Sequence, residues 1–292
     1  MGLRKLLRAR NRALASQQEP PLNLQVLFPR AVWPFADTFT RMLQKVHPSL
    51  AHVRVEMRIP IEGPSVGLME QLALVQWAQH TVYVGFLSVP APADLLEQTV
   101  NTALLYEDAW KEQAHAHTAH AILIYKGQER SPLEQYRALA KIAVGLLPLG
   151  ASVVLNPNAC TSCPVVRLAP QPGEELEQVL STLPWMTLFI GFVTLQVEGH
   201  EGLWVRTCGA PRLNMPDLAL HIDRDQDVRN IYRLFRSTFD TMHSTGVRFK
   251  AGDMLVDEEL QWKFRQPRAD EGFLYSPQLI VFEPMPPTGP MH

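Results

Sequence analysis

The densest apolar run of this 292-residue chain covers residues 183–197. It is rich in β-branched and aromatic residues, a composition that favours a strand buried on both faces. A loop with two glycines follows, and residues 203–207 then predict a second strand. Because a Gly-containing loop between two such runs is typical of a hairpin, we predict a β-hairpin here, with the rest of the fold arranged around it.

Apolar periodicity predicts the remaining elements. The predicted strands cover 24–28, 52–59, 72–77, 81–89, 119–125, 151–155, 218–222, 254–256, 260–264 and 279–282, and the predicted helices cover 33–46, 94–113, 131–146, 175–183 and 225–243. Asp94 and Ser131 are expected to cap two of the helices, and Gly246 to end the last one. On the helix at 33–46, Phe35 and Phe39 are expected to share the buried face. These elements predict an α+β fold, with antiparallel-rich mixed sheets and helices packed on them.

The predicted elements fall into two units. We expect an N-terminal α+β unit over 20–156 and a C-terminal one over 175–283, separated by a Pro- and Asn-rich loop at 156–174. A Pro-rich tail follows at 284–292. Tyr83–Phe86 and Phe189–Phe192 share an aromatic–branched–Gly–Phe pattern, which is compatible with two related units.

Residues 1–19 stand apart, because they carry five basic residues and no acid before Glu19. Leucines at helical spacing make this segment a short basic amphipathic helix. It fits a membrane-surface or partner-docking helix through residues 1–14, a transit peptide, or a solvated terminus.

Composition restricts the function classes. The formal net charge of −2 provides no overall attraction for nucleic acid or anionic lipid. Three cysteines are few and odd in number, which argues against a secreted disulfide scaffold. No apolar run reaches the roughly 18–20 residues that a membrane span needs. We therefore expect a cytoplasmic protein.

Histidines and cysteines form the first candidate site. His115, His117 and His120 run from near the end of a predicted helix into a predicted strand, and in a strand His115 and His117 would share a face. Neutral imidazoles are good ligands for zinc or iron. Cys160 and Cys163 have the spacing of half a structural zinc site, so the five residues together would complete a ligand set. The alternative is that the histidines sit at a helix C-terminus and the cysteines are small loop residues, with no cofactor.

A single cysteine forms the second candidate site. Cys208 follows a predicted strand, and Arg206 two positions earlier would lower the pKa of its thiol. A nucleophilic role also needs a base, for which His200, His221 and His243 are the candidates.

Carboxylates form the third candidate site. Asp253 is followed by Asp257 and two glutamates, which could act as acid and base or hold a cation. The alternative is a Gly–Asp turn leading into a solvated acidic loop.

Several short motifs of the C-terminal half resemble a bacterial family, the domain-of-unknown-function family numbered 4261. The similar segments are Leu183–Trp185, Gly191–Phe192, Arg206–Ala210, Met215–Leu218 and Gly252–Asp253, with the strongest resemblance from 204 to 264. The resemblance implies an α+β fold and a bacterial origin, and it carries no established activity or catalytic residue. If it holds, Gly209, Pro216, Asp217, Gly252 and Asp253 are structural turn residues.

A well-patterned core without a convincing catalytic motif indicates a non-enzymatic binding or accessory protein. One version is an immunity-like protein that blocks a toxin or effector by binding it. The alternatives are a metal-dependent or Cys/His hydrolase, and a membrane-peripheral adaptor that uses residues 1–14.

Overall fold

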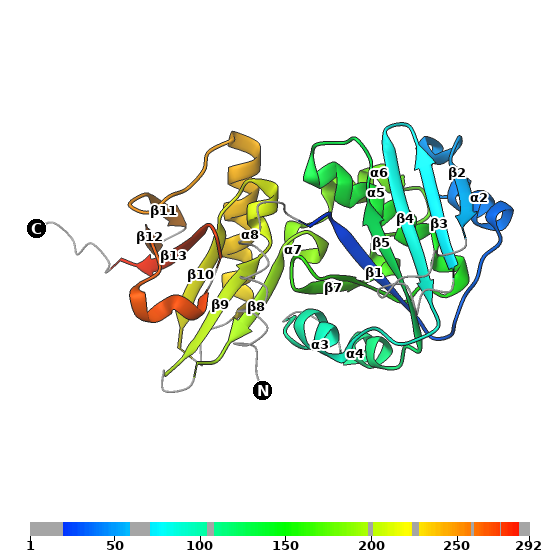
Figure 1. Ribbon diagram of the computed structural model, residues 1–292. Helices are drawn as coiled ribbons and strands as arrows, with labels where there is room; N and C mark the ends of the chain where they lie inside the picture. Colours follow the sequence, from blue (N-terminus) through cyan, green and yellow to red (C-terminus); the bar gives the residue numbers. More distant parts are fainter. Residues whose placement is uncertain are drawn as a thin grey trace, which may run out of the picture. The chain divides into compact units, whose positions relative to one another are not determined.

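The computed structural model describes residues 20–58, 71–103, 108–197, 201–223, 228–257, 260–274 and 276–285. The chain divides into two compact units, Glu19–Phe189 (the N-terminal unit) and Ile190–His292 (the C-terminal unit), shown in Figure 1. Both combine helices with a largely antiparallel sheet, so the predicted α+β fold is confirmed. No helix among the described residues is both long and apolar enough to cross a membrane.

The N-terminal unit is built on a seven-stranded antiparallel sheet with the order β2-β3-β4-β5-β1-β6-β7. Its strands are β1 (Asn23–Phe28), β2 (Arg54–Arg58), β3 (Gln71–Trp77), β4 (His80–Leu87), β5 (Ala119–Tyr125), β6 (Val153–Asn156) and β7 (Thr161–Pro164). Its helices are α2 (Ala36–Gln44), η1 (Pro48–Leu50), α3 (Ala93–Leu96), η2 (Glu97–Asn101), α4 (Asp108–His115), α5 (Pro132–Gly145), η3 (Leu147–Leu149), η4 (Val165–Leu168), α6 (Leu176–Thr182) and α7 (Trp185–Leu188).

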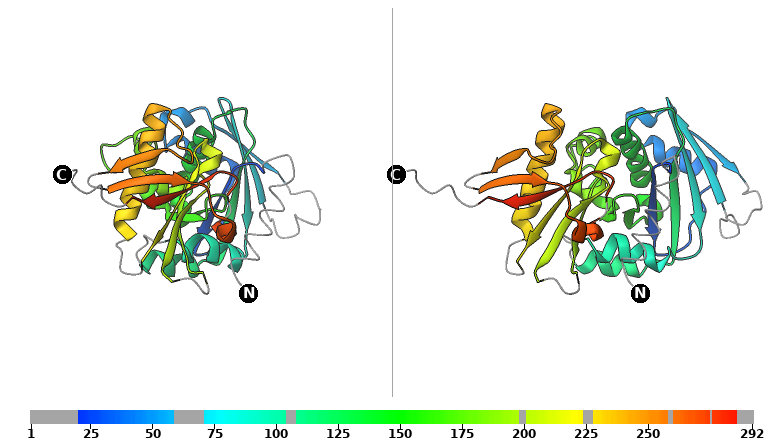
Figure 2. Two further views of the ribbon diagram at one scale, coloured as in Figure 1. Left: turned by 90° about the vertical axis from the view of Figure 1, so that its left-hand side faces the viewer. Right: turned by 60° about the vertical axis from the view of Figure 1, so that its left-hand side comes forward.

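Helices cover both faces of this sheet. α5 contacts β1, β4, β5 and α2 on one side. On the other side, side chains of α3, η2 and α4 form an apolar cluster with Leu27 of β1 and Leu155 of β6. Figure 2 shows these layers from two further directions. Burial on both faces explains why central strands such as β5 are almost entirely apolar.

Local sequence explains α5. Ser131 caps it by accepting the Glu134 N–H (3.5 Å), and Pro132 occupies the first helical position, as predicted.

The predicted helix over 94–113 is wrong in two respects. It is interrupted: α3 passes into the π-helical η2, and α4 begins only at Asp108. The N-cap is Pro92 and not Asp94, whose carboxylate accepts the N–H of the next residue.

The unit boundary falls at Phe189, later than the 156–174 loop that we expected. That stretch contains β7 and η4, and β7 pairs with β6 of the N-terminal sheet. Asn156 starts the tight connection between them, because its carboxamide oxygen accepts the Asn158 N–H (3.1 Å). α6 contacts α5, and α7 contacts β7, so these helices belong to the same unit.

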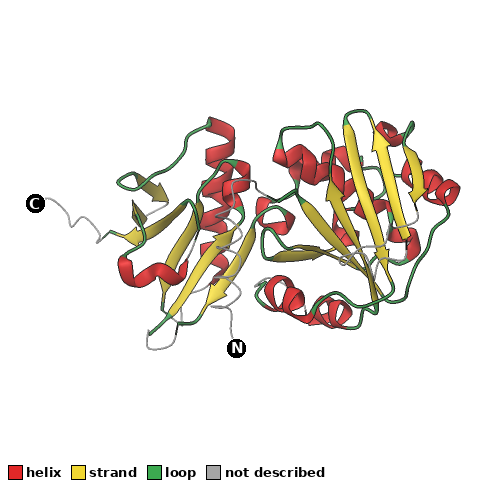
Figure 3. Ribbon diagram, viewed as in Figure 1, coloured by secondary structure: helices red, strands yellow, loops and turns green. Residues whose placement is uncertain are grey.

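The C-terminal unit has a six-stranded sheet with the order β11-β12-β13-β10-β9-β8, in which only β10 and β13 run parallel among the described pairs. Its elements are β8 (Gly191–Leu195), β9 (Leu203–Cys208), η5 (Ala210–Leu213), β10 (Asp217–Ile222), α8 (Val228–Thr245), β11 (Met254–Asp257), β12 (Leu260–Arg265), η6 (Ala269–Leu274) and β13 (Leu279–Pro284), drawn by type in Figure 3.

The two faces of the C-terminal sheet are covered by different elements. α8 packs on one face, where Phe235 contacts Phe192 of β8 and Phe282 of β13. η6 covers the other face, where Leu274 lies in an apolar cluster with Trp204 of β9. α8 ends as predicted, because Gly246 adopts a φ of 73° and donates its N–H to Met242.

The apolar run at 183–197 is not one strand. Its first half forms α7, and β8 begins only at Gly191. Pro184 precedes the first turn of α7, in which the Phe189 N–H donates to the Trp185 carbonyl (3.1 Å). A short apolar run cannot be assigned to strand or helix by periodicity alone. The predicted hairpin is confirmed for its second half, since β8 and β9 pair antiparallel.

The repeated pattern does not occupy equivalent places in the two units. Tyr83–Phe86 lies inside β4, whereas Phe189 follows α7 and only Gly191 and Phe192 lie in β8. The strand orders of the two sheets also differ.

Candidate functional site

The three histidines of the predicted metal site lie in three different elements. His115 ends α4, His117 lies in the connection that follows, and His120 lies in β5. The expectation that His115 and His117 share one strand face is therefore wrong. His115 forms a hydrogen bond with Asn101 (2.9 Å).

Both ring nitrogens of His117 are used by the main chain. Nε2 accepts the Ala91 N–H (2.7 Å), and Nδ1 pairs with the Ala114 carbonyl (2.5 Å). His120 Nδ1 pairs with the Val89 carbonyl (2.8 Å). Burial lowers the pKa of both imidazoles, which favours their neutral forms. The two histidines therefore fasten the β4–α3 connection to the sheet.

The two cysteines of that predicted site are buried in and beside β7. Burial raises the pKa of Cys163 to about 12, so its thiol stays protonated. Throughout the part of the chain that the structure describes, no three His, Cys, Asp or Glu side chains are grouped to hold a metal ion. His115, His117, His120, Cys160 and Cys163 are therefore not gathered into a ligand set.

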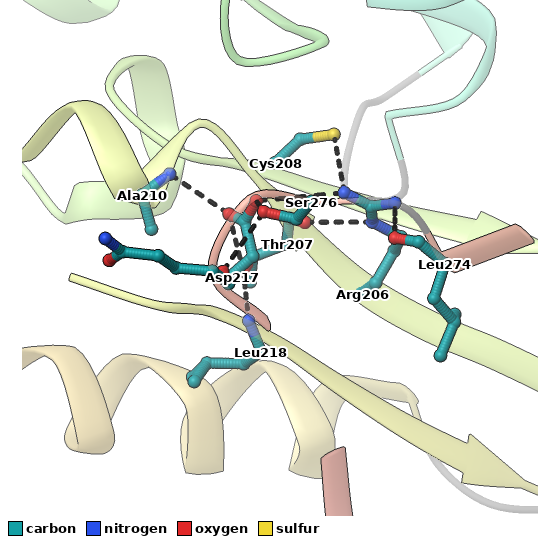
Figure 4. A network of polar contacts seen from close by, with 9 residues as sticks. Arg206, Thr207, Cys208, Ala210, Asp217, Leu218, Leu274 and Ser276 are labelled. Atoms are coloured by element: carbon teal, nitrogen blue, oxygen red, sulfur yellow. Dashed lines mark hydrogen bonds and ion pairs between the residues drawn. The ribbon is translucent and has the colours of Figure 1, made fainter. Parts of the chain in front are cut away.

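Cys208 takes part in a buried polar network centred on Arg206 (Figure 4). Both side chains project from the same face of β9, as expected for positions two apart. Arg206 Nη2 lies 3.5 Å from the Cys208 sulfur, so the predicted proximity of thiol and cation is present. The guanidinium also donates to the carbonyls of Thr207 (Nε, 3.0 Å) and Leu274 (Nη1).

Asp217, the first residue of β10, is the acidic member of this network. Its Oδ2 lies 3.8 Å from Arg206 Nη2 and accepts the Ser276 hydroxyl (2.6 Å). Its Oδ1 accepts the Ala210 N–H (3.0 Å) and the Thr207 hydroxyl (3.3 Å). Burial raises the pKa of Asp217 to about 6, and an electrostatic interaction with Cys208 adds to this, while Arg206 and the hydrogen bonds from Ser276 and Ala210 oppose it.

Neither of the two described candidate bases, His221 and His243, lies next to Cys208. His221 pairs in register with Trp204, four residues along β9 from Cys208, or about 13 Å at strand spacing. Its ring contacts Trp204 in a tilted arrangement, and its Nε2 forms a hydrogen bond with the Glu201 carbonyl (2.8 Å). His243 is exposed on α8, which packs on the opposite face of the sheet. His200 lies outside the described residues.

The Arg206 network instead joins four segments of the C-terminal unit. The Thr207 hydroxyl accepts the Leu218 N–H (2.8 Å), which ties β9 to β10. Arg206 donates to the Leu274 carbonyl at the end of η6, and Asp217 accepts the hydroxyl of Ser276 in the η6–β13 connection. Two of the segments that carry the family resemblance, 206–210 and 215–218, thus lie together around one buried ion pair. A third, the strand start at 191–192, pairs with Cys208 and Thr207 of β9.

Asp253 lies in the turn before β11. Its carboxylate accepts the Lys250 N–H (3.0 Å), and Gly252 has a φ of 97°, which glycine tolerates best. This is the Gly–Asp turn of the alternative interpretation. β11 ends at Asp257, and Glu258 and Glu259 lie outside the described residues.

Two exposed aromatic residues were missed by the sequence analysis. Phe35 is 81% exposed and Trp33 is 51% exposed. We expected Phe35 on the buried helix face, but α2 begins at Ala36, so Phe35 is the N-cap and points away from the core. Phe39 is buried as expected. No periodic pattern could have separated Phe35 from Phe39, because they stand one helical turn apart.

The backbone around these two aromatics is held in place. Pro34 lies between them, and its carbonyl accepts the Gln71 side-chain N–H (3.1 Å). The Phe35 carbonyl accepts the Phe39 N–H (2.9 Å) in the first turn of α2. We call the exposed Trp33 and Phe35 side chains, which flank the buried Pro34, the aromatic patch.

Comparisons with family models, with curated proteins and with solved structures find no match to this chain. The resemblance to the family numbered 4261 therefore stays a prediction. The basic segment 1–14 lies outside the described residues, so its membrane role also stays a prediction.

Proposed function

We propose that this protein is a non-enzymatic cytoplasmic accessory protein of a bacterium that binds another protein, with the aromatic patch as its anchor. The observation that carries the proposal is the 81% exposure of Phe35 beside the 51% exposure of Trp33. Aromatic residues are enriched at protein interfaces and dominate their binding energy. Large apolar side chains exposed together are a feature of binding sites.

The rigidity of the aromatic patch supports the same proposal. A side chain on an ordered backbone loses less conformational entropy when a partner covers it, and an aromatic side chain has only two rotatable bonds to order, so more of the burial energy becomes affinity. The fixed φ of Pro34, the Gln71 hydrogen bond and the first turn of α2 order the backbone from which the two rings project. An immunity-like protein, which blocks a toxin or effector by covering its surface, is one form that this function takes.

The proposal is tested by purifying the chain with the products of its neighbouring genes. We expect a stable complex, and we expect the Trp33→Ala/Phe35→Ala variant to weaken it by about ten-fold or more. Val166→Ala is the matched control, because Val166 is 45% exposed in the same unit and away from the aromatic patch in sequence. Absence of a complex, or equal affinity of both variants, would contradict the proposal.

The same preparation tests the metal-enzyme alternative. Elemental analysis that finds stoichiometric zinc or iron, lost in His117→Ala, would favour that alternative over a binding protein. We expect no such metal dependence, because both nitrogens of His117 are occupied by the main chain.

A further inference from the structure

β11 forms one edge of the six-stranded sheet. It pairs with β12 on one side, with Leu255 opposite Trp262, and it is the last strand in the order of the described sheet. An edge strand presents a row of backbone N–H and C=O groups that can pair with another chain.

The hydrogen-bond pattern shows which residues face that edge. Phe264 donates its N–H to the Asp253 carbonyl (2.9 Å), so the backbone of Asp253 faces β12. Because backbone groups alternate along a strand of an antiparallel pair, Leu255 also faces β12. Met254 and Val256 therefore direct their backbone groups to the outer edge of β11, which pairs with no described strand and which we call the free edge.

The side chains of the same two residues are exposed and apolar. Met254 is 52% exposed and Val256 is 64% exposed. By contrast β2, an edge strand of the other sheet, exposes Arg54, Glu56 and Arg58, and charged side chains of this kind prevent edge-to-edge pairing. β11 has no Lys, Arg or Pro among its residues.

Acidic residues stand at both ends of the exposed apolar pair. Asp253 precedes β11 and Asp257 ends it. In the described structure the Asp253 carboxylate accepts a main-chain N–H and forms no ion pair. Lys263 lies opposite Met254 on β12, so it is one strand further from the free edge. In the register of a strand added to β11, the first and last positions would therefore fall opposite Asp253 and Asp257.

These charges disfavour pairing of β11 with a second copy of itself. An antiparallel pair that sets Met254 against the copy's Val256 also sets Asp253 against the copy's Asp257. Like charges directly opposite each other destabilise such a pair. A segment with basic residues at both ends has the opposite, favourable effect.

We propose that β11 binds an extended segment of a partner protein, as an added strand with three apolar residues flanked by Lys or Arg. This mode is β-augmentation, in which main-chain hydrogen bonds provide affinity and side chains provide selectivity. The proposal rests on the proposed function in that it assumes a protein partner, and it assigns a second contact surface, in the C-terminal unit.

Fluorescence anisotropy with three synthetic peptides tests it on the full chain. The first peptide contains Lys-Val-Ile-Val-Lys, the second Glu-Val-Ile-Val-Glu, and the third is the first with N-methylated backbone amides. We expect the first to bind at least about ten-fold more tightly than the other two. Equal binding of the N-methylated peptide, or no binding of the first, would overturn the proposal without requiring any variant of the protein.

Two variants separate the backbone from the side chain. Val256→Pro removes an edge-facing N–H and is expected to abolish binding of the first peptide. Val256→Thr keeps that N–H and the branched shape, and it is expected to change the affinity less than about three-fold. Circular dichroism checks that both variants remain folded. Equal loss in both would overturn strand addition.

The result is distinguishable from failure of the proposed function. If Val256→Pro leaves a partner complex intact while Trp33→Ala/Phe35→Ala disrupts it, β11 is not a docking edge and the binding function stands. A concentration-dependent dimer that Val256→Pro abolishes would overturn the proposal in favour of a second copy.

Discussion

Both compact units bury a cation, but they surround it in different ways. In the C-terminal unit, the Arg206 and Asp217 side chains are only 3% and 4% exposed. In the N-terminal unit, Nζ of Lys141 (α5) lies 2.6 Å from Oε2 of Glu177 (α6), and the Glu177 side chain is 43% exposed. The planar guanidinium reaches four groups at once, while the ammonium bonds Glu177 and the Ser49 hydroxyl (3.4 Å).

The two carboxylates respond in opposite directions. Burial raises the pKa of Glu177, but the hydrogen bond and charge of Lys141 outweigh burial, so the net pKa is lowered. At Asp217 burial outweighs Arg206, and the pKa rises to about 6. A close cation and access to water therefore favour the ionised form of Glu177, whereas the more distant cation and full burial favour the protonated form of Asp217 up to about pH 6.

The largest effect is expected when Arg206 is removed. Arg206→Met should lower the free energy of unfolding by roughly 3–5 kcal/mol, because Asp217 and the Leu274 carbonyl lose their buried partner. Urea unfolding of the full chain measures it. Arg206→Lys keeps the positive charge but not the planar guanidinium, so its free energy of unfolding should lie between those of the native protein and Arg206→Met. A loss below about 1 kcal/mol in Arg206→Met would show that the network contributes little.

A smaller, pH-dependent effect is expected at Asp217. Its folded pKa of about 6 lies above its ordinary value of 3.8, so the folded state binds more protons between these values. The contribution of Asp217 to stability therefore falls as pH rises from about 4 to 6 and stays low above that. In Asp217→Asn the side chain at this position does not titrate. The free energy of unfolding of this variant, relative to that of the native protein, should therefore increase by roughly 1–3 kcal/mol as pH rises from about 4 to 6.

Urea unfolding of the native protein and of Asp217→Asn at several pH values between 4 and 8 provides the measurement. Asp217→Ala serves as the control, because it removes the acceptor of the Ala210 N–H and should be destabilised at every pH. A constant difference between native protein and Asp217→Asn over that range would contradict the raised pKa.

The smallest effects are expected at the N-terminal ion pair. Lys141→Met should cost about 1–2 kcal/mol and Glu177→Gln less than about 1 kcal/mol, since water already solvates the Glu177 carboxylate. The Glu177 contribution should be present above its ordinary pKa of 4.5 and lost as pH falls through the lower folded pKa. A double-mutant cycle measures the coupling. A coupling as large as that of Arg206 with Asp217 would remove the contrast between the units.

Local sequence predicted the elements whose pattern repeats over several turns or several strand positions. β5, α5 and α8 were placed within a few residues because burial, capping and the glycine stop act over short distances. The proximity of Cys208 to Arg206 was predictable for the same reason, since residues two apart on a strand share a face. The helix α7 in the first half of 183–197 was not predictable, because a short apolar run is compatible with a strand or a helix.

What the sequence by itself determined is therefore the α+β class, most of the elements and the Arg206–Cys208 contact. Only the tertiary structure decided that Asp217 and Leu274 complete the Arg206 network, that His117 is bound by Ala91, and that Phe35 and β11 are uncovered. The physical reason is separation along the chain. Periodicity records which face of an element is apolar, but which element covers that face depends on strand order and on contacts between residues tens of positions apart.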